Sequence, residues 1–189
     1  LCTQFTQNVL ADEASFALEL QGEADLAGLP AFLRNSAQSA ARQRGWGEQR
    51  YAITLSPSLV EPFLTFSSRR DLREAVWRSR KARGSHAGAH DNRPIAARIV
   101  ALRQEQAALH GYASYADYEL VDRMAGQPAA VLDLLHRAWE PAKQKAAHDR
   151  ADLTSMAQSL GEPVPIAAWD WRYLAEKVRQ TRFNLDDAE

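Results

Sequence analysis

Two histidines, His86 and His90, have the spacing in this chain that most resembles a metal-binding motif. Histidines four positions apart bind zinc in an H-E-x-x-H helix, where the glutamate between them acts as the general base. Here residues 87–89 are Ala-Gly-Ala, so the base is missing, and the glycines of this stretch predict a loop. With Asp91 the pair could form a loose three-ligand site, but a solvated loop is the interpretation we prefer.

A basic segment, Arg69–Arg83, is the second candidate, because it carries seven cations against two acids. Such a segment could bind phosphates or steer an anionic ligand. No phosphate-binding motif accompanies it, however, and arginine stems often cover apolar neighbours while their charges stay in water. We therefore expect a solvated helix face, with nucleic-acid or anion binding as the less favoured alternative.

Three aromatic residues, Trp169, Trp171 and Tyr173, form the third candidate. Large amphipathic rings suit binding surfaces, and these three could line a peptide-binding channel. Aromatic residues at this spacing on a helix more often belong to the core, and we weight that alternative more. The sequence contains no G-x-S-x-G, P-loop or G-x-G-x-x-G motif, and its other histidines lack a partner at ligand spacing. From the residues alone we predict no catalytic residue and no metal ligand.

The bulk properties indicate an ordinary soluble globular protein. A chain of 189 residues, 46% hydrophobic and 25% charged, predicts one domain over residues 1–189 with a core of its own. The net charge of −1 argues against a general nucleic-acid binder. The single cysteine, Cys2, cannot form an internal disulfide, and no run approaches the ~20 apolar residues that cross a bilayer. We therefore expect a cytoplasmic protein with no nucleic-acid or membrane partner.

A helical hairpin in residues 91–118 is the best-marked of the elements that would position these candidates. Asp91 and Asn92 can cap its first helix, along which an apolar stripe recurs at helical spacing: Ile95, Ile99, Leu102 and Leu109. Gly111 stands where a glycine typically ends a helix. Ser114 and Asp117 then form a capping box that opens the next helix.

The rest of the pattern predicts more helices and one short β element. Alternating apolar residues in 16–20 and 51–55 predict two strands that pair. Helical patterns cover four further segments: residues 1–14, 29–44, 69–83 and 171–178. Pro57 and Pro62 are expected to bracket a short helix that carries Phe63 and Phe66, and Pro141 to kink the longest one, residues 128–160. The apolar face of this longest helix consists of Val131, Leu135, Ala138, Ala142, Ala146, Leu153, Met156 and Leu160. The fold class is therefore all-α, with one short two-stranded β element.

Several stretches also occur in an order that spans nearly the whole chain: 4–10 (QFTQNVL), 25–30 (DLAGLP), 62–66 (PFLTF), 91–95 (DNRPI), 111–116 (GYASYA) and 168–173 (AWDWRY). Together they resemble the zinc metallopeptidases of the thimet oligopeptidase, oligopeptidase A and peptidyl-dipeptidase group, and the last stretch is most similar to the peptidyl-dipeptidase branch. Cys2, His90 and His110 depart from the residues that this family usually has there.

The resemblance implies a mostly helical peptidase of two halves that face each other across a deep channel. It also implies one Zn²⁺, held by an H-E-x-x-H motif and a downstream glutamate, which activates water for peptide hydrolysis. No residue of this chain matches that motif, so no catalytic or metal-binding role carries over, and the zinc of the parent protein is expected outside this segment. The segment would form part of the channel wall that admits short peptides.

Both ends of the chain favour a fragment over a complete protein. The first residue is Leu1, and Asn184–Asp187 is typical of a helix start. We therefore expect part of a zinc peptidyl-dipeptidase or oligopeptidase, inactive alone, that acts on short peptides only with its catalytic half. Apolar surface around residues 169–178 is expected to cause self-association. The alternative is a stand-alone helical interaction module without catalysis.

Overall fold

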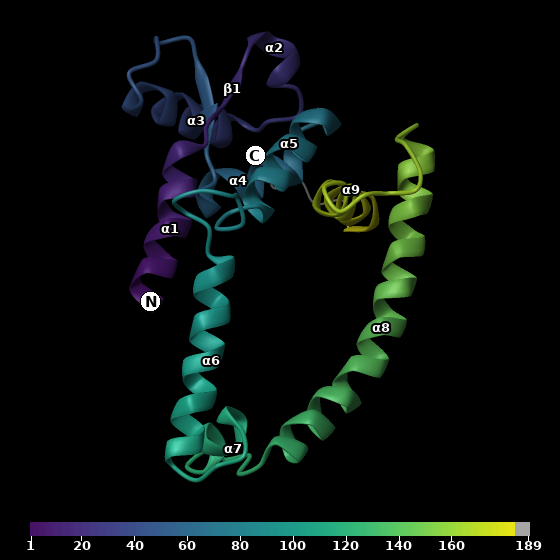
Figure 1. Cartoon of the computed structure of the whole chain (residues 1–189). Helices are drawn as coiled ribbons and strands as arrows, with labels where there is room; N and C mark the ends of the chain where they lie inside the picture. Colours follow the sequence, from purple (N-terminus) through teal and green to yellow (C-terminus); the bar gives the residue numbers. More distant parts are fainter. Residues whose placement is uncertain (184–189) are drawn as a thin grey trace.

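The computed structural model of the chain describes residues 1–183, which are mostly helical (Figure 1). The elements follow in the order α1 (Cys2–Ser15), β1 (Leu18–Leu20), α2 (Gly22–Asp25), α3 (Ala31–Gln43), β2 (Tyr51–Ile53), α4 (Pro57–Phe66), α5 (Arg70–Lys81), α6 (Arg93–Leu109), α7 (Tyr115–Leu120), α8 (Pro128–Ser159) and α9 (Trp171–Phe183). The all-α prediction is confirmed. The helix start expected at Asn184–Asp187 lies outside the described residues.

The β element is an antiparallel pair, as the alternating patterns predict. Leu18 faces Ile53 and Leu20 faces Tyr51 in the register of the two strands. Ile53 and Leu20 are buried, because every second side chain of a strand points to the same face and that face lies on the core. The sheet thereby joins the segment after α1 to the segment before α4.

The main core lies where α3, α4 and α5 pack around this sheet. Leu33, Ile53, Phe63 and Val76 are all fully buried within it. The predicted short helix that carries Phe63 and Phe66 is confirmed as α4, although Pro62 lies inside it and does not mark its end. The buried apolar face of α4 offsets the hydrogen bond that the proline ring removes.

Residues 93–159, which we call the arm, extend from this core as α6, α7 and α8. Figure 1 shows α6 and α8 diverging from α7, with α9 lying between α5 and α8. The predicted end of α6 and start of α7 are confirmed. Gly111 follows α6 with a φ of 80°, and the Ser114 hydroxyl accepts a hydrogen bond from Asp117 N at 3.1 Å. α8 continues through Pro141 as a single helix that bends along its length (Figure 1).

Of the two residues expected to cap α6, Asp91 accepts a hydrogen bond from Arg93 N at 2.9 Å. Asn92 does not cap α6 with its side chain and instead attaches the arm to α1. Its amide accepts a hydrogen bond from Asn8 Nδ2 and donates one to Phe5 O, each at 2.9 Å. Asn8 and Asn92 are both buried, so their amides need partners more than the solvated helix start does. The tertiary contact therefore outweighs the local cap.

The apolar stripes of α6 and α8 are each covered mainly at the end that joins the rest of the structure. On α6, Leu102 and Leu109 are exposed, and on α8 only Leu153 and Ala157 are buried. These two form a second, smaller core with Leu174 and Tyr173 of α9. No helix within residues 1–183 combines the length and apolarity that membrane spanning requires.

Candidate functional site

Asp170, directly before α9, is the most heavily hydrogen-bonded carboxylate at the junction of α5 and α9. Arg70 donates to it from Nη2 at 2.9 Å and from Nε at 3.1 Å, and Arg73 donates from Nη2 at 3.1 Å. The backbone N–H of Ala167 donates a further bond at 2.9 Å. Asp170 is 3% exposed and Arg73 is 0% exposed, so the contact is buried and charge-assisted. It connects α5 to α9 across 97 residues of sequence.

The environment of Asp170 favours its ionised form. Burial by itself raises the pKa of this carboxyl, but the hydrogen bonds from Arg70, Ala167 N and Arg73 outweigh it, and the pKa lies below the ordinary value. The carboxylate is therefore charged at neutral pH. Its negative charge compensates Arg73, which would otherwise be a buried cation without an acidic partner among the described residues.

This ion pair predicts a specific acid sensitivity. Because the pKa of Asp170 is lower in the folded chain than the 3.8 of a free aspartate, the pair contributes full stability above about pH 4 and loses it as pH falls through the folded value. In urea unfolding between pH 2 and 7, the difference between the wild-type chain and Asp170→Asn should shrink below about pH 4. A difference that stays constant over this range would contradict the assignment.

Most other cations of the basic segment also pair with acids, while Arg78 and Lys81 are exposed, as expected of a solvated helix face. Arg69 contacts Asp25 and Asp71, Arg78 contacts Glu74, Arg80 contacts Glu61, and Arg83 contacts Glu13. Several of these acids come from other elements, which the local sequence of α5 could not reveal. The segment therefore connects α5 to neighbouring elements through several ion pairs.

The three aromatic candidates lie in three different environments. Trp169 meets Trp77 edge to face at 5.7 Å between ring centres, and Tyr173 lies buried under the Arg73 guanidinium at 4.1 Å. Trp171 is half-buried and lines a hollow between α8 and α9. The three rings therefore do not form one continuous surface within this chain. Of the three, Trp171 is the residue that lines the hollow between α8 and α9.

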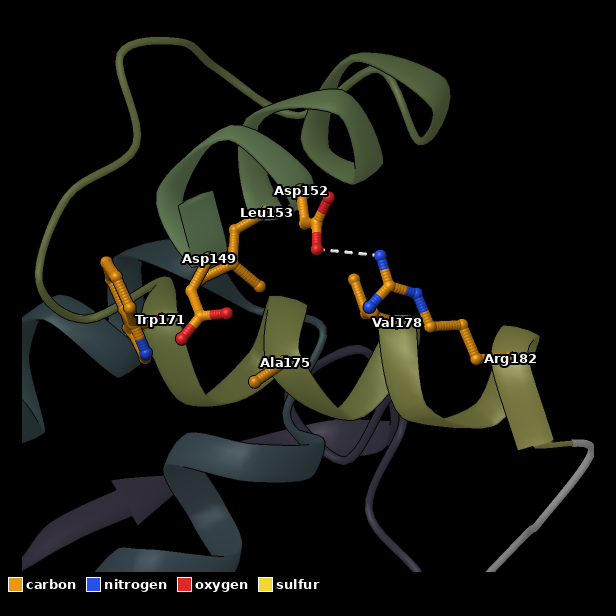
Figure 2. A pocket seen from close by; sticks show the side chains of 7 residues that line it. All are labelled: Asp149, Asp152, Leu153, Trp171, Ala175, Val178 and Arg182. Atoms are coloured by element: carbon orange, nitrogen blue, oxygen red, sulfur yellow. Dashed lines mark hydrogen bonds and ion pairs between the residues drawn. The ribbon is translucent and has the colours of Figure 1, made fainter. Parts of the chain in front are cut away.

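The hollow has a volume of about 160 Å³ and is shown in Figure 2. α9 contributes Trp171, Ala175, Val178 and Arg182, and α8 contributes Asp149, Asp152 and Leu153. Arg182 donates to Asp152 at 2.7 Å across the opening, and this bond lowers the pKa of the Asp152 carboxyl. The arrangement offers an apolar floor that can seat a small side chain. Both carboxylates of the hollow have cationic partners, since Asp152 pairs with Arg182 and Asp149 pairs with Lys145.

The possible zinc ligands in the 86–91 loop do not converge. The Asp91 carboxylate accepts three hydrogen bonds from Arg93, whose side chain is the main cause that lowers the pKa of Asp91 to about 2. His90 Nδ1 lies 3.3 Å from Asp12 on α1, and His86 is exposed. Across residues 1–183 no three His, Cys, Asp or Glu side chains lie close enough to hold a metal ion. The residues of this loop therefore do not fit a zinc site.

Sequence reasoning missed the residues with the strongest contacts, Asp170, Arg70 and Arg73. Asp170 stands between two tryptophans just before a helix, where an aspartate usually indicates an N-cap. The sequence feature that could have indicated this contact is the excess of arginines in α5, because buried arginines in a folded chain need acidic partners from other elements. That signal does not say which acid is the partner.

Most of the chain matches the sequence pattern of a known protein family. The sequence pattern of peptidase family M3 matches residues 63–189. Over the whole chain, the sequence is 32% identical to the dipeptidyl carboxypeptidase of Salmonella typhimurium, 32% identical to the oligopeptidase A of Haemophilus influenzae and 30% identical to a probable cytosolic oligopeptidase A of Arabidopsis thaliana. In each case the chain spans 28% of the length of the relative.

Proposed function

Because the chain belongs to peptidase family M3, we propose that it is a non-catalytic part of a peptidase that hydrolyses short peptides. The observation that carries this proposal is the similarity of the whole chain to peptidases that are far longer than the chain itself. The H-E-x-x-H motif does not occur in its sequence. Zinc and the general base would then be supplied by residues outside this chain, in a cytoplasmic enzyme of the peptidyl-dipeptidase or oligopeptidase type.

Within that peptidase, this chain would form part of the wall of the substrate channel. Trp171 supports this role, because its ring borders a hollow large enough for a small side chain. The buried Asp170–Arg73 pair would hold α9, and with it Trp171, against the rigid core. Trp169 and Tyr173 would then support the wall from behind, since they pack against Trp77 and Arg73.

A chimera tests the proposal. In it, this chain replaces the segment of the Salmonella typhimurium dipeptidyl carboxypeptidase to which it is 32% identical. We expect the chimera to hydrolyse short peptides, and the same enzyme with that segment deleted to lose at least about a hundredfold in kcat/KM, because positioning of the substrate is lost. Steady-state kinetics of peptide cleavage measure the activity of the chimera and of the deletion variant.

Two outcomes would contradict the proposal: a folded chimera without peptidase activity, or a deletion variant that keeps it. The first outcome would favour the alternative of a stand-alone interaction module. In a working chimera, Trp171→Asp should raise KM more than Trp169→Asp. This follows because the Trp171 ring borders the hollow whereas the Trp169 ring packs on Trp77.

A further inference from the structure

The arm has almost no core of its own. Between residues 93 and 152, all of which the structure describes, Ala107 is the only buried hydrophobic residue. Large apolar side chains are exposed over the same stretch: Val100, Leu102, Leu109, Val121, Met124, Leu132, Leu134, Leu135 and Trp139. Helices in water gain most of their stability from packing an apolar face, and exposed patches of this kind usually mark a binding surface.

The apolar stripe of α8 shows where the missing contact lies. At 100° per residue, Leu132, Leu135, Trp139, Leu153 and Ala157 fall within an arc of about 60° on one side of this 32-residue helix. Its C-terminal end packs against α9 through Leu153 and Ala157. Leu135 and Trp139, at the other end, are 56% and 60% exposed. One continuous stripe is thus covered for its last turns and bare before them.

The stripe of α6 repeats this arrangement. Ile95 and Ile99, near the start of the helix, are half-buried, and Ile99 borders residues of α1. Leu102 and Leu109, on the same side, are exposed. Both helices of the arm are therefore covered where they join the core and bare toward α7, which lies at the shared end of α6 and α8 (Figure 1). Gln106 lies among the bare residues of α6, so the missing contact includes a polar group.

We propose that this bare surface, formed by Leu102 and Leu109 on α6 and by Leu132, Leu135 and Trp139 on α8, docks against the part of an M3 peptidase that lies outside this chain. The proposal rests on the proposed function. We infer this partner from the length of the similar peptidases. The chain spans 28% of each of them, so most of such an enzyme lies outside the chain and is available to cover the arm. The partner's face that contacts the arm would be apolar, with one hydrogen-bonding group opposite Gln106. The surface lies on the arm, away from residues 169–178, where Tyr173 and Leu174 are already buried.

Hydrogen exchange in the chimera described above tests this surface directly. Amides of residues 128–142 should exchange more slowly in the chimera than in the isolated chain, on the order of tenfold or more, because the partner suppresses local opening of α8. The double variant Leu135→Asp/Trp139→Asp should remove this protection. Leu134→Asp is the matched control: Leu134 is 60% exposed but lies about 100° around the helix from Leu135, so protection should persist.

Each other outcome overturns the proposal. Equal exchange in the chimera and the isolated chain, equal effects of the two α8 variants, or a chimera without cooperative unfolding would each do so. Sedimentation of the isolated chain tests whether a second copy of the chain binds this surface instead. A dimer that the Leu135→Asp/Trp139→Asp variant abolishes would assign the surface to a second copy. Peptide cleavage separates the two proposals. Protection without cleavage would contradict only the peptidase function, and cleavage that is unaffected by the α8 variants would contradict only the docking surface.

Discussion

Asp170→Asn is expected to lower the free energy of unfolding by about 3–5 kcal/mol, because it leaves the fully buried Arg73 as an uncompensated cation. The asparagine can still accept a hydrogen bond but carries no charge. Arg73 would therefore have only neutral partners, among them the Ser67 carbonyl, to which Nη1 donates at 2.7 Å, and the Tyr173 ring. Urea unfolding at pH 7 measures the effect. Loss of this pair should also release the N-terminal end of α9 from α5.

The matched control for this substitution is Asp71→Asn. Asp71 also pairs with an arginine of the basic segment, Arg69, but its side chain is 63% exposed and the pair is screened by water. The control should therefore change stability far less. Adding Arg73→Met to Asp170→Asn should recover part of the loss, because the buried charge is removed as well. An Asp170→Asn variant no less stable than the control would contradict a structural role for this pair.

Gly28→Ala is expected to cost ~3 kcal/mol or more, the sum of a left-handed backbone and steric overlap. Gly28 has a φ of 81°, and a Cβ atom there would overlap the carbonyl oxygen of Phe66 and lie 2.6 Å from Ser68 Oγ. At this point the turn before α3 meets the junction of α4 and α5, where Ser68 N donates to Ala27 O at 3.0 Å. Thermal or urea unfolding of the variant measures the cost.

Gly45→Ala separates the two contributions. Gly45 has a similar φ of 74°, but nothing lies within 4 Å of the added Cβ. Its substitution should cost only ~1–2 kcal/mol, the penalty of the left-handed conformation alone. Equal losses at the two positions would show that close packing at Gly28 does not contribute.

Features set by neighbouring residues were predictable from the sequence. The end of α6 at Gly111 and the start of α7 at Ser114 depend on bonds within a few residues, and each gave a clear signal. The pairing of β1 with β2 followed from alternating patterns that each strand shows by itself. The resemblance to the peptidase family likewise rested on short local stretches.

Features set by distant residues were not predictable in the same way. Asn92 offers a cap in its local sequence, but its partner is Asn8, 84 residues away. Asp170 similarly offers a cap, although its carboxylate binds Arg70 and Arg73 of α5. Helical periodicity placed Leu102 on the apolar stripe of α6 and Leu135 on that of α8, yet it cannot say whether the element that covers them lies within the chain. Both side chains are in fact exposed.

Peptide cleavage by the purified chain alone tests the central claim most directly, namely that this M3 chain is a non-catalytic part of a peptidase. The chain is incubated with zinc and short peptides, with and without a chelator. We expect no hydrolysis above that of the peptides in buffer, because the sequence holds no H-E-x-x-H motif and the loop histidines do not converge on a metal site. Zinc-dependent cleavage that the chelator stops, and that His90→Ala abolishes, would contradict the account.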